Sequence, residues 1–402
     1  MKSLDDYRGI VSDHVLAQIY SKSTRLNNYH VVHVNSTYSG GGVAEILHNM
    51  TILMNDIGID TGWRMLPGPQ GFYTTTKRMH NALQGEDISM DLINKDLYLE
   101  TNEKFAVFTH LAEHDCVIVH DPQPLPFIKY CRKHQPWVWR CHIDFSNPHK
   151  ELWEYLKTFV LRYDMVIVSD PKYMPKDLPV EQRIIMPSID PLAAKNMDIE
   201  QDTIDHYLQM YNIPTDKPII LQISRFDKWK DPLGVIEVFR RVRKSVDCRL
   251  ILCGGAATDD PEGAEIYQNV VSNNQDLIEA GELLLITAED NTMVNALQRT
   301  ASVVMQKSTK EGFGLTVTEA LWKEKPVVAS NVGGIPNQVI DGENGLLVDP
   351  NNFDQCAEAV LRLLKDKNYA AQLGKKAKEF VRDKFLITRH VLDYINLLLD
   401  LL

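Results

Sequence analysis

The chain lacks any long apolar run and any excess of positive charge. No stretch of its 402 residues resembles the 18-residue uncharged segment that a membrane span needs. Residues 1–16, MKSLDDYRGIVSDHVL, lack the basic flank and apolar core of a signal peptide. The formal charge of −11 opposes binding to nucleic acid or to an anionic membrane surface. We therefore expect a cytoplasmic protein without membrane or nucleic-acid partners.

Paired cysteines are also lacking. The six cysteines form no Cys-x-x-Cys pair and show no spacing typical of metal ligands. They are Cys116, Cys131, Cys141, Cys248, Cys253 and Cys356. This pattern fits reduced, mostly packed thiols in a reducing compartment. We expect no disulfide.

Short apolar segments separated by helical patterns recur along the chain. They are residues 29–35, 116–120, 165–168, 218–223, 250–252 and 326–329. The first runs into a glycine turn and then into an apolar-periodic helix at 43–57. Short apolar strands that alternate with amphipathic helices predict an α/β protein with parallel sheets covered on both faces.

The length predicts more than one domain, because a single hydrophobic core rarely grows to this size. A proline-flanked stretch at 186–191 and a new strand after 216 divide the pattern, and we place a hinge near residue 190. The expected domains are 1–190 and 191–385. Residues 386–402 form a final helix with an apolar face.

The first candidate motif is the glycine turn Gly40, Gly41 and Gly42 between a strand and a helix. Without Cβ atoms, the backbone amides can approach a phosphate at the positive end of the helix. The motif is not Gly-x-Gly-x-x-Gly, and a flexible turn of any α/β protein would look the same. Phosphate binding and a plain turn both remain open.

The second motif brings Arg225 and Lys230 into the loop after a strand. Ligands of open α/β sheets bind at such strand ends. An arginine fork and a lysine point charge can together stabilise a departing diphosphate without a metal. The alternative is a solvated charge cluster.

The third and most specific motif is EGFGLTVTE, with Glu311 and Glu319 eight residues apart. The residues that open the predicted helix are Gly312, Phe313, Gly314 and Leu315. If the helix starts near Gly314, its first amides can receive a phosphate, and both carboxylates can accept bonds from sugar hydroxyls. The alternative is a coincidental acidic pair on a surface helix.

The fourth motif is a polar cluster at two strand ends of the first half. Its members are His120, Asp121, Gln123, Trp137, Trp139, Arg140, His142 and Asp144. We expect the tryptophans to stack on sugar rings while the polar side chains bind hydroxyls. The His/Asp pairs also raise a metal site, but no further ligand cluster supports one. We expect no metal.

These motifs resemble the retaining glycosyltransferases of the GT-B fold that carry a Glu-x7-Glu motif. That fold implies two Rossmann-like domains facing across a cleft, with the last helix returning to the N-terminal domain. The resemblance implies that Glu311 binds hydroxyls of the transferred sugar and that Glu319 binds the nucleotide ribose. It assigns the diphosphate to Arg225 and Lys230.

The resemblance also implies roles for the first half of the chain. There the glycine turn contacts the same phosphates from the opposite domain, and His142 lies beside the transferred sugar. The segments HVNSTYSGGGVAEILHNM, HDPQP, WVWRCHID and EGFGLTVTEA are similar to those of archaeal and bacterial trehalose synthases. The acceptor pocket would then draw on His120, Asp121, Gln123, Arg140 and Asp144.

The implied reaction joins glucose from UDP-, ADP- or GDP-glucose to free glucose, gives trehalose, and needs no metal or other cofactor. The nucleotide base, the direction and a homodimer are left open. A trehalose phosphorylase is the nearest alternative, since fungal-type phosphorylases are related. Another retaining hexosyltransferase, an epimerase, a glycogen-synthase-like polymerase and a non-catalytic sugar-nucleotide sensor share the expected fold.

Overall fold

A computed structural model describes residues 2–38, 41–255, 261–287 and 290–402 of the chain. The chain forms two compact units, which are described separately. Unit 1 comprises Met1–Ser188 and Ile387–Leu402, and unit 2 comprises Ile189–Leu386. The chain therefore passes between the units twice.

Unit 1 is built on a six-stranded parallel sheet in the order β2-β1-β3-β4-β5-β6. The strands are β1 (His30–Asn35), β2 (Asp60–Met65), β3 (Cys116–His120), β4 (Trp137–Arg140), β5 (Met165–Val168) and β6 (Glu181–Ile184). In this register His33 pairs with Ile118, and His120 pairs with Arg140. Paired residues of parallel strands share a face, and side chains alternate along each strand. His33, His120 and Arg140 therefore lie on the same face.

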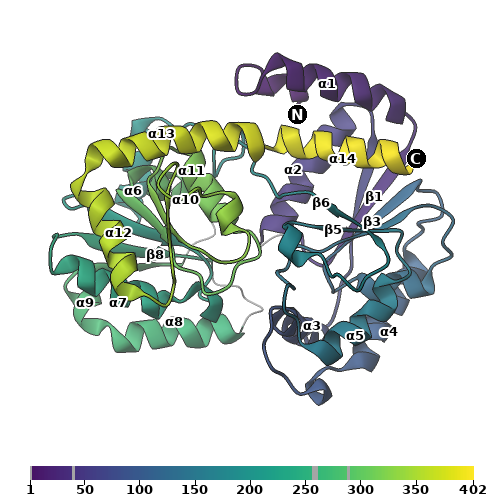
Figure 1. Cartoon of the computed structure of the whole chain (residues 1–402), viewed down its shortest axis with the longest axis horizontal. Coiled ribbons are helices and arrows are strands. Elements are labelled where there is room, and N and C mark those ends of the chain that lie inside the picture. Colours follow the sequence, from purple (N-terminus) through teal and green to yellow (C-terminus); the bar gives the residue numbers. More distant parts are fainter. Residues whose placement is uncertain (1, 39–40, 256–260, 288–289) are drawn as a thin grey trace. The chain divides into compact units, whose positions relative to one another are not determined.

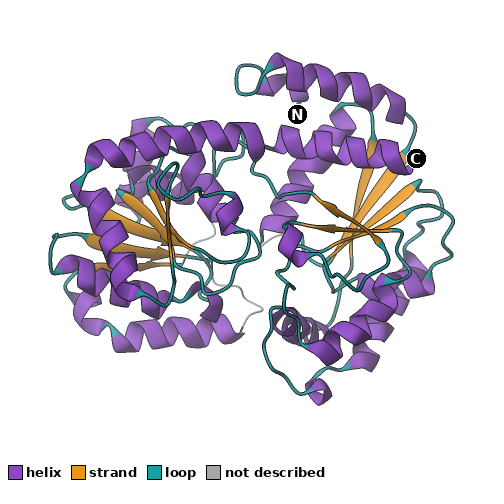
Figure 2. Ribbon diagram, viewed as in Figure 1, coloured by secondary structure: helices purple, strands orange, loops and turns teal. Residues whose placement is uncertain are grey.

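Helices cover both faces of this sheet (Figure 2). They are α1 (Asp13–Ser23), α2 (Gly42–Asp56), α3 (Gln70–Leu83), α4 (Lys95–Phe108), α5 (Lys150–Val160) and α14 (Ile387–Leu401), with short 3-10 turns η1 (Leu4–Tyr7), η2 (Thr24–Leu26), η3 (Met90–Leu92), η4 (Leu125–Tyr130) and η5 (Pro171–Tyr173). Helices α3, α4 and α5 share one core with the valines and tryptophans of the central strands. Helix α14 packs with α1 and α2 on the histidine-bearing face (Figure 1).

Unit 2 is built on a second six-stranded parallel sheet in the order β12-β11-β10-β7-β8-β9. The strands are β7 (Ile219–Ile223), β8 (Arg249–Cys253), β9 (Leu283–Ile286), β10 (Val303–Gln306), β11 (Val327–Ser330) and β12 (Leu346–Val348). The helices are α6 (Gln201–Met210), α7 (Pro232–Arg243), α8 (Pro261–Asn273), α9 (Gln275–Glu279), α10 (Asn291–Thr300), α11 (Leu315–Trp322), α12 (Phe353–Lys365) and α13 (Lys367–Lys384), with η6 (Lys228–Lys230) and η7 (Ile335–Asn337). They too lie on both faces (Figure 1).

The parallel sheets expected from the sequence are confirmed. Each expected strand coincides with an observed one to within a residue at either end, and the expected helix at 43–57 is α2. The final helix is α14, and it packs on α1 as the resemblance implied. All six cysteines are unbonded thiols. No helix in the described part of the chain combines the length and the hydropathy that a membrane span requires.

Candidate functional site

Two loops of unit 2 meet because the strands that precede them are neighbours. β7 and β10 pair in the sheet, so the loops at 224–231 and 307–314 leave the same edge. The Thr309 amide donates to the Trp229 carbonyl oxygen at 2.8 Å and joins them. The second and third sequence motifs are thereby brought together.

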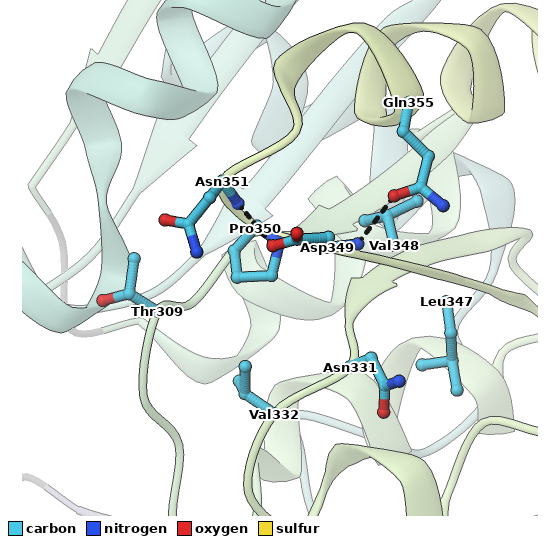
Figure 3. A pocket seen from close by; sticks show the side chains of 9 residues that line it. All are labelled: Thr309, Asn331, Val332, Leu347, Val348, Asp349, Pro350, Asn351 and Gln355. Carbon is cyan, nitrogen blue, oxygen red and sulfur yellow. Dashed lines mark hydrogen bonds between the residues drawn. The ribbon is translucent and has the colours of Figure 1, made fainter.

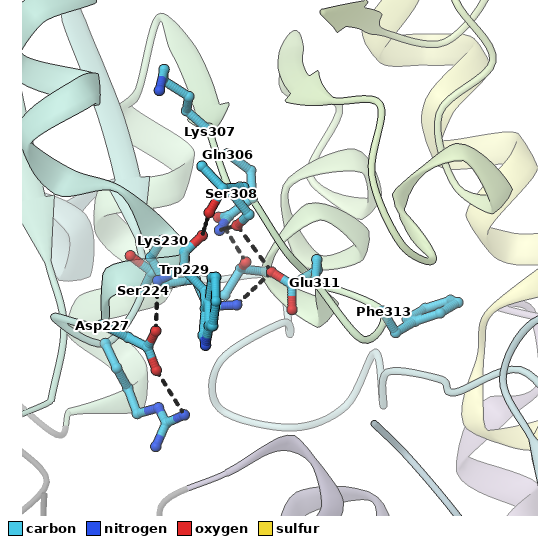
Figure 4. A network of polar contacts seen from close by, with 12 residues as sticks. Ser224, Asp227, Trp229, Lys230, Gln306, Lys307, Ser308, Glu311 and Phe313 are labelled. Atoms are coloured by element: carbon cyan, nitrogen blue, oxygen red, sulfur yellow. Dashed lines mark hydrogen bonds and ion pairs between the residues drawn. The ribbon is translucent and has the colours of Figure 1, made fainter. Parts of the chain in front are cut away.

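Lys230 and Glu311 form an ion pair where these loops meet (Figure 4). Lys230 Nζ lies 2.5 Å from Glu311 Oε2, and that oxygen also accepts a bond from Ser308 Oγ at 3.2 Å. Only 18% of the lysine side chain and 10% of the glutamate side chain are exposed. Partial burial reduces the screening of both charges by water, so their attraction holds the two side chains in place. A hydroxyl that reaches Glu311 would lie beside a cation.

Arg225 occupies the more open side of the same loop. Its side chain is 46% exposed, and Nη2 lies 3.7 Å from Asp227 Oδ2. Asp227 is buried and caps η6 by accepting a bond from the Trp229 amide at 2.8 Å. The Asp227 carboxylate therefore stabilises the loop, and the guanidinium of Arg225 stays accessible to an anion.

Helix α11 begins directly after Gly314, which confirms the helix start expected from the sequence. Gly314 has a φ of +85°, which favours glycine, and a Cβ there would lie 3.2 Å from Glu311 Cγ. The first residue of α11 is Leu315, which is half-buried. The positive end of this helix therefore lies beside Glu311.

The loop before α11 is anchored on both sides. The Phe313 ring is buried against Phe385, with 5.6 Å between ring centroids. A Cβ on Gly334 would lie 2.7 Å from the Gly312 carbonyl oxygen, so only glycine permits this approach. The loop is thus held in one conformation by packing.

Glu319 lies in a more enclosed place than Glu311. Its residue exposure is 2%, and its oxygens lie 3.6 Å from Lys195 Nζ and 3.3 Å from Gln298 Nε2. The two carboxylates of the motif therefore differ in environment. Glu311 belongs to the loop, whereas Glu319 belongs to the buried face of α11.

Unit 2 also has a polar hollow with a volume of about 450 Å³ at the ends of β10, β11 and β12 (Figure 3). Its lining residues are Thr309, Asn331, Val332, Leu347, Val348, Asp349, Pro350, Asn351 and Gln355. None of the site residues expected from the sequence lines it. It adjoins the Glu311 loop only through Thr309.

The polar cluster of unit 1 contains a chain of three imidazoles. His33 Nδ1 lies 2.9 Å from His120 Nε2, and His120 Nδ1 lies 3.0 Å from His142 Nε2. His33 and His120 are buried beneath α14, whereas His142 is half-buried. Burial lowers the pKa of His33 to about 3 and lowers the pKa of the other two well below the usual value. All three are therefore neutral.

Asp121 holds the backbone of His142. Its Oδ1 accepts a bond from the His142 amide at 2.7 Å, and its own amide donates to the Arg140 carbonyl oxygen at 2.8 Å. Asp121 has a φ of +63°, an uncommon conformation for a residue other than glycine. Burial raises the pKa of its carboxyl to about 6.

The expected stacking role of the two strand tryptophans is wrong. Trp137 and Trp139 have no exposed surface, because β4 is a central strand and these side chains face the core beneath α3, α4 and α5. The Trp139 indole donates to the Asp121 carbonyl oxygen at 2.9 Å. Another aromatic pair of unit 1 has one exposed member: the exposed Tyr38 stacks on the half-buried Trp63, with 5.2 Å between ring centroids.

Other expected acceptor residues lie at different depths. Arg140 is completely buried, and its Nη2 donates to Ser169 Oγ at 3.0 Å. Gln123 and Asp144 are half-buried in the loops that follow β3 and β4. Asp144 Oδ1 accepts bonds from the amide and the hydroxyl of Ser146. Arg140 thus supports the cluster from inside.

The glycine turn is described only in part. Gly40 lies outside the described residues. Gly41 is the N-cap of α2 and Gly42 is its first residue. The positive end of α2 therefore starts where the sequence places the phosphate-binding turn.

The sequence pattern misses three members of the buried cluster. His33 is enclosed in an apolar strand, and His390 and Tyr394 lie on α14, more than two hundred residues beyond the other members. The rings of Tyr394 and His33 lie 5.8 Å apart, and those of Tyr394 and His390 lie 5.0 Å apart. The one available signal is His33, which lies inside the apolar run YHVVHVN.

No group of three or more His, Cys, Asp or Glu side chains in the described ranges is placed to hold a metal ion. The imidazoles of unit 1 instead use their nitrogens on one another. Near Glu311, Arg225 and Lys230 carry positive charge.

Known proteins resemble the chain over nearly its whole length. Residues 33–175 match the family model described as the N-terminal domain of trehalose synthase, and residues 204–380 match glycosyl transferases group 1. The chain is 44% identical to the trehalose synthase of Thermococcus litoralis over 400 residues, which covers 99% of this chain and 97% of that protein. A trehalose phosphorylase of Pleurotus pulmonarius is 28% identical over 87% of this chain and 54% of its own length.

The fold is similar to that of solved glycosyltransferases. The sucrose-phosphate synthase of Thermosynechococcus elongatus superposes with a TM-score of 0.71 at 19% identity, covering 92% of this chain and 99% of that one. Two parallel six-stranded Rossmann-like sheets with this topology constitute the GT-B fold. The fold expected from the sequence is confirmed.

Proposed function

Since the chain belongs to the trehalose synthase family of glycosyltransferases, we propose that it joins glucose from a nucleoside diphosphate-glucose to free glucose and so forms α,α-trehalose. The structural observation that carries this proposal is the Lys230–Glu311 pair beside the half-exposed Arg225. It places cations for a diphosphate next to a carboxylate for sugar hydroxyls.

The donor site is proposed to lie at this edge of unit 2. Arg225, Lys230 and the first amides of α11, near Gly314 and Leu315, would bind the diphosphate. Glu311 would accept bonds from hydroxyls of the transferred glucose. Glu319, whose Oε1 lies 3.6 Å from Lys195 Nζ, would bind the ribose, as the resemblance implies.

Unit 1 is proposed to supply the acceptor side. His142 would lie beside the transferred sugar, with Asp121 holding its backbone. Gln123 and Asp144 are exposed enough to meet the acceptor glucose, whereas His120 and Arg140 act through their neighbours because both are buried. Gly41 and Gly42 at the start of α2 would add backbone amides to the phosphates.

The proposed chemistry retains the anomeric configuration by attack on the face that the phosphate leaves. The bond from glucose C1 to the phosphate oxygen breaks, and a bond from C1 to the acceptor hydroxyl oxygen forms. The released phosphate oxygen takes the acceptor proton. Lys230 and Arg225 stabilise the leaving charge, so side-chain cations do what a divalent metal would otherwise do.

A covalent intermediate is disfavoured on the geometry of Glu311. A nucleophilic carboxylate must lie behind the reacting carbon with an available oxygen. Glu311 Oε2 is already engaged by Lys230 and Ser308, and the carboxylate is proposed to bind hydroxyls of the transferred glucose. Positioning and leaving-group electrostatics then carry the reaction.

The test is a donor and acceptor screen with products identified by NMR. UDP-, ADP- or GDP-glucose with free glucose should give a non-reducing disaccharide, and excess EDTA should leave the rate unchanged. A product with a free reducing end, or use of glucose 6-phosphate in place of glucose, would refute the trehalose proposal. Release of glucose 1-phosphate from trehalose and inorganic phosphate would instead identify a phosphorylase.

A further inference from the structure

The imidazole chain of unit 1 has two inner members that the proposed reaction does not use. His142 would meet the sugar, but His120 and His33 lie behind it in a line of hydrogen bonds of 3.0 and 2.9 Å. Both inner rings are buried, with 2% and 0% of their surface exposed. They cannot contact a ligand without unfolding of the site, so any effect they have on the reaction passes through His142.

The surroundings keep all three rings of the imidazole chain neutral. From the sheet, Arg140 lies close enough for its charge to lower the pKa of His120 and His142, although burial is the larger cause. Asp121 also faces the cluster from the sheet, as does Tyr394 from α14. Two further groups of α14 face it: His390, whose pKa burial lowers well below its usual value, and Arg389, which pairs with Asp393.

A neutral imidazole has one N–H and one lone pair, so the direction of one bond sets all the others. In the first arrangement His33 Nδ1 donates to His120, and His120 Nδ1 donates to His142. The proton of His142 is then on Nδ1. In the second arrangement every bond reverses, and the His142 proton is on Nε2.

The environment of His33, at the inner end of the imidazole chain, favours the first arrangement. His33 Nε2 is buried, and no hydrogen-bond partner for it exists among the described residues. The second arrangement would place a proton on that nitrogen and bury an unpaired N–H. The first arrangement leaves only a lone pair on that nitrogen. A buried N–H group without an acceptor is rare in proteins, so the first arrangement is favoured.

We propose that His33 and His120 are positioning residues that hold His142 as the Nδ1-protonated tautomer. His142 then presents a hydrogen-bond donor to a hydroxyl oxygen of the bound sugar, and this last step rests on the function proposed above. Nε2 of His142 is occupied by His120, so Nδ1 is the ring nitrogen that remains for a ligand. Helix α14 closes the inner end through Tyr394, which packs on His33.

Nitrogen NMR of the ligand-free protein tests the tautomer directly. In protein labelled with ¹⁵N-histidine, a two-bond ¹H–¹⁵N correlation spectrum distinguishes the protonated from the unprotonated ring nitrogen. The His142 signals, identified by their loss in His142→Ala, should show a protonated Nδ1. In His120→Phe and His33→Phe the two nitrogens should shift toward a mixture of tautomers, whereas the exposed His134→Phe should change nothing.

Kinetics separate this role from a structural one. If only a fraction of molecules holds the competent tautomer, the apparent affinity for donor falls by that fraction while kcat at saturation is kept. In His33→Phe the KM for nucleotide-sugar should therefore rise about two- to tenfold with kcat close to that of the unsubstituted protein. Loss of folded protein would lower kcat and leave KM unchanged.

Two results would overturn the inference. One is a His142 proton on Nε2 in the unsubstituted protein, and the other is an unchanged tautomer in both His120→Phe and His33→Phe. The spectra are recorded without substrate, so they do not depend on turnover. A protein that makes no trehalose but shows the Nδ1 tautomer would contradict the proposed function and leave this inference standing.

Discussion

At the scale of single residues, the Lys230–Glu311 pair is proposed to serve both substrate binding and chemistry. Each side chain is less than one-fifth exposed, and their atoms lie 2.5 Å apart. In such a setting a charge that loses its partner costs far more than a surface charge would. The pair therefore holds a cation and an acceptor in fixed places before a ligand arrives.

Replacing Lys230 by Ala should reduce kcat at least about a hundredfold, which is the loss expected for one preorganised group that stabilises transition-state charge. Arg225→Ala should have a similar effect for the same reason. Steady-state rates with nucleoside diphosphate-glucose and glucose measure both. Lys228→Ala is the matched control, since Lys228 is exposed in the same turn and packs over the Trp229 ring. Turnover that persists undiminished in both variants would remove these residues from the reaction.

At the scale of elements, α14 and the central strands enclose the titratable cluster of unit 1. The helix supplies His390 and Tyr394, and the strands supply His33 and His120. Burial leaves these three imidazoles and that of His142 neutral in the folded protein, whereas in the unfolded chain all four become charged below their usual pKa of about 6.5. Folding of unit 1 is therefore linked to pH.

The sign of this linkage predicts acid sensitivity. Below about pH 6.5 the unfolded chain binds up to four protons on these histidines that the folded unit does not bind. Asp121 offsets one of these protons. Its pKa in the folded unit is about 6, so in this pH range the folded unit binds a proton on Asp121 that the unfolded chain does not bind. A net of three protons makes the free energy of unfolding fall by up to about 4 kcal/mol per pH unit as the pH drops from 6 to 5.

Urea unfolding at several pH values, followed by tryptophan fluorescence, measures this slope. His390→Gln should reduce it by about one proton, or about 1.4 kcal/mol per pH unit, because one titrating group is removed. The exposed His134→Gln should leave the slope as it is. Equal stability at pH 7 and pH 5, or a gain on acidification, would contradict neutral burial of the cluster.

At the scale of the whole molecule, the two passages of the chain between its units lie together. The Ile189 amide donates to the Phe385 carbonyl oxygen at 2.8 Å, and Ile189 forms an isolated bridge with Leu386. The proline-flanked stretch at 186–191 contributes the first passage. We propose that these paired segments act as the hinge of the molecule.

The hinge proposal predicts compaction on substrate binding. The glycine turn and the Glu311 loop belong to different units, yet both are proposed to address one donor, so the units must approach when it binds. The radius of gyration from small-angle scattering should fall when nucleoside diphosphate-glucose and glucose are both present. Glucose alone should have little effect. An unchanged scattering curve with both substrates would argue against closure.

The sequence by itself determined the class of fold and pointed to the two loops that are proposed to bind the donor. Central strands of a parallel sheet are buried on both faces, so they appear as apolar runs that can be recognised without a structure. The loop after a strand carries the ligand groups, and glycine marks where a helix starts close to another backbone. Arg225, Lys230, Glu311 and Gly314 were readable for this reason. The edge strands β2 and β6 were not, since their sequences DTGWRM and EQRI are largely polar. The apolar strands β9, β10 and β12 were also not among the expected strands.

Only the tertiary structure decided which polar residues of unit 1 act together. The sequence pattern does not show that Trp137 and Trp139 face the core, because a strand buried on both faces has no polar side to mark its orientation. Nor does it show that α14 brings His390 and Tyr394 over His33, since contacts between residues far apart in the chain depend on packing and not on local pattern. The histidine chain exists because three neighbouring parallel strands, β1, β3 and β4, and one distant helix converge on a single buried face.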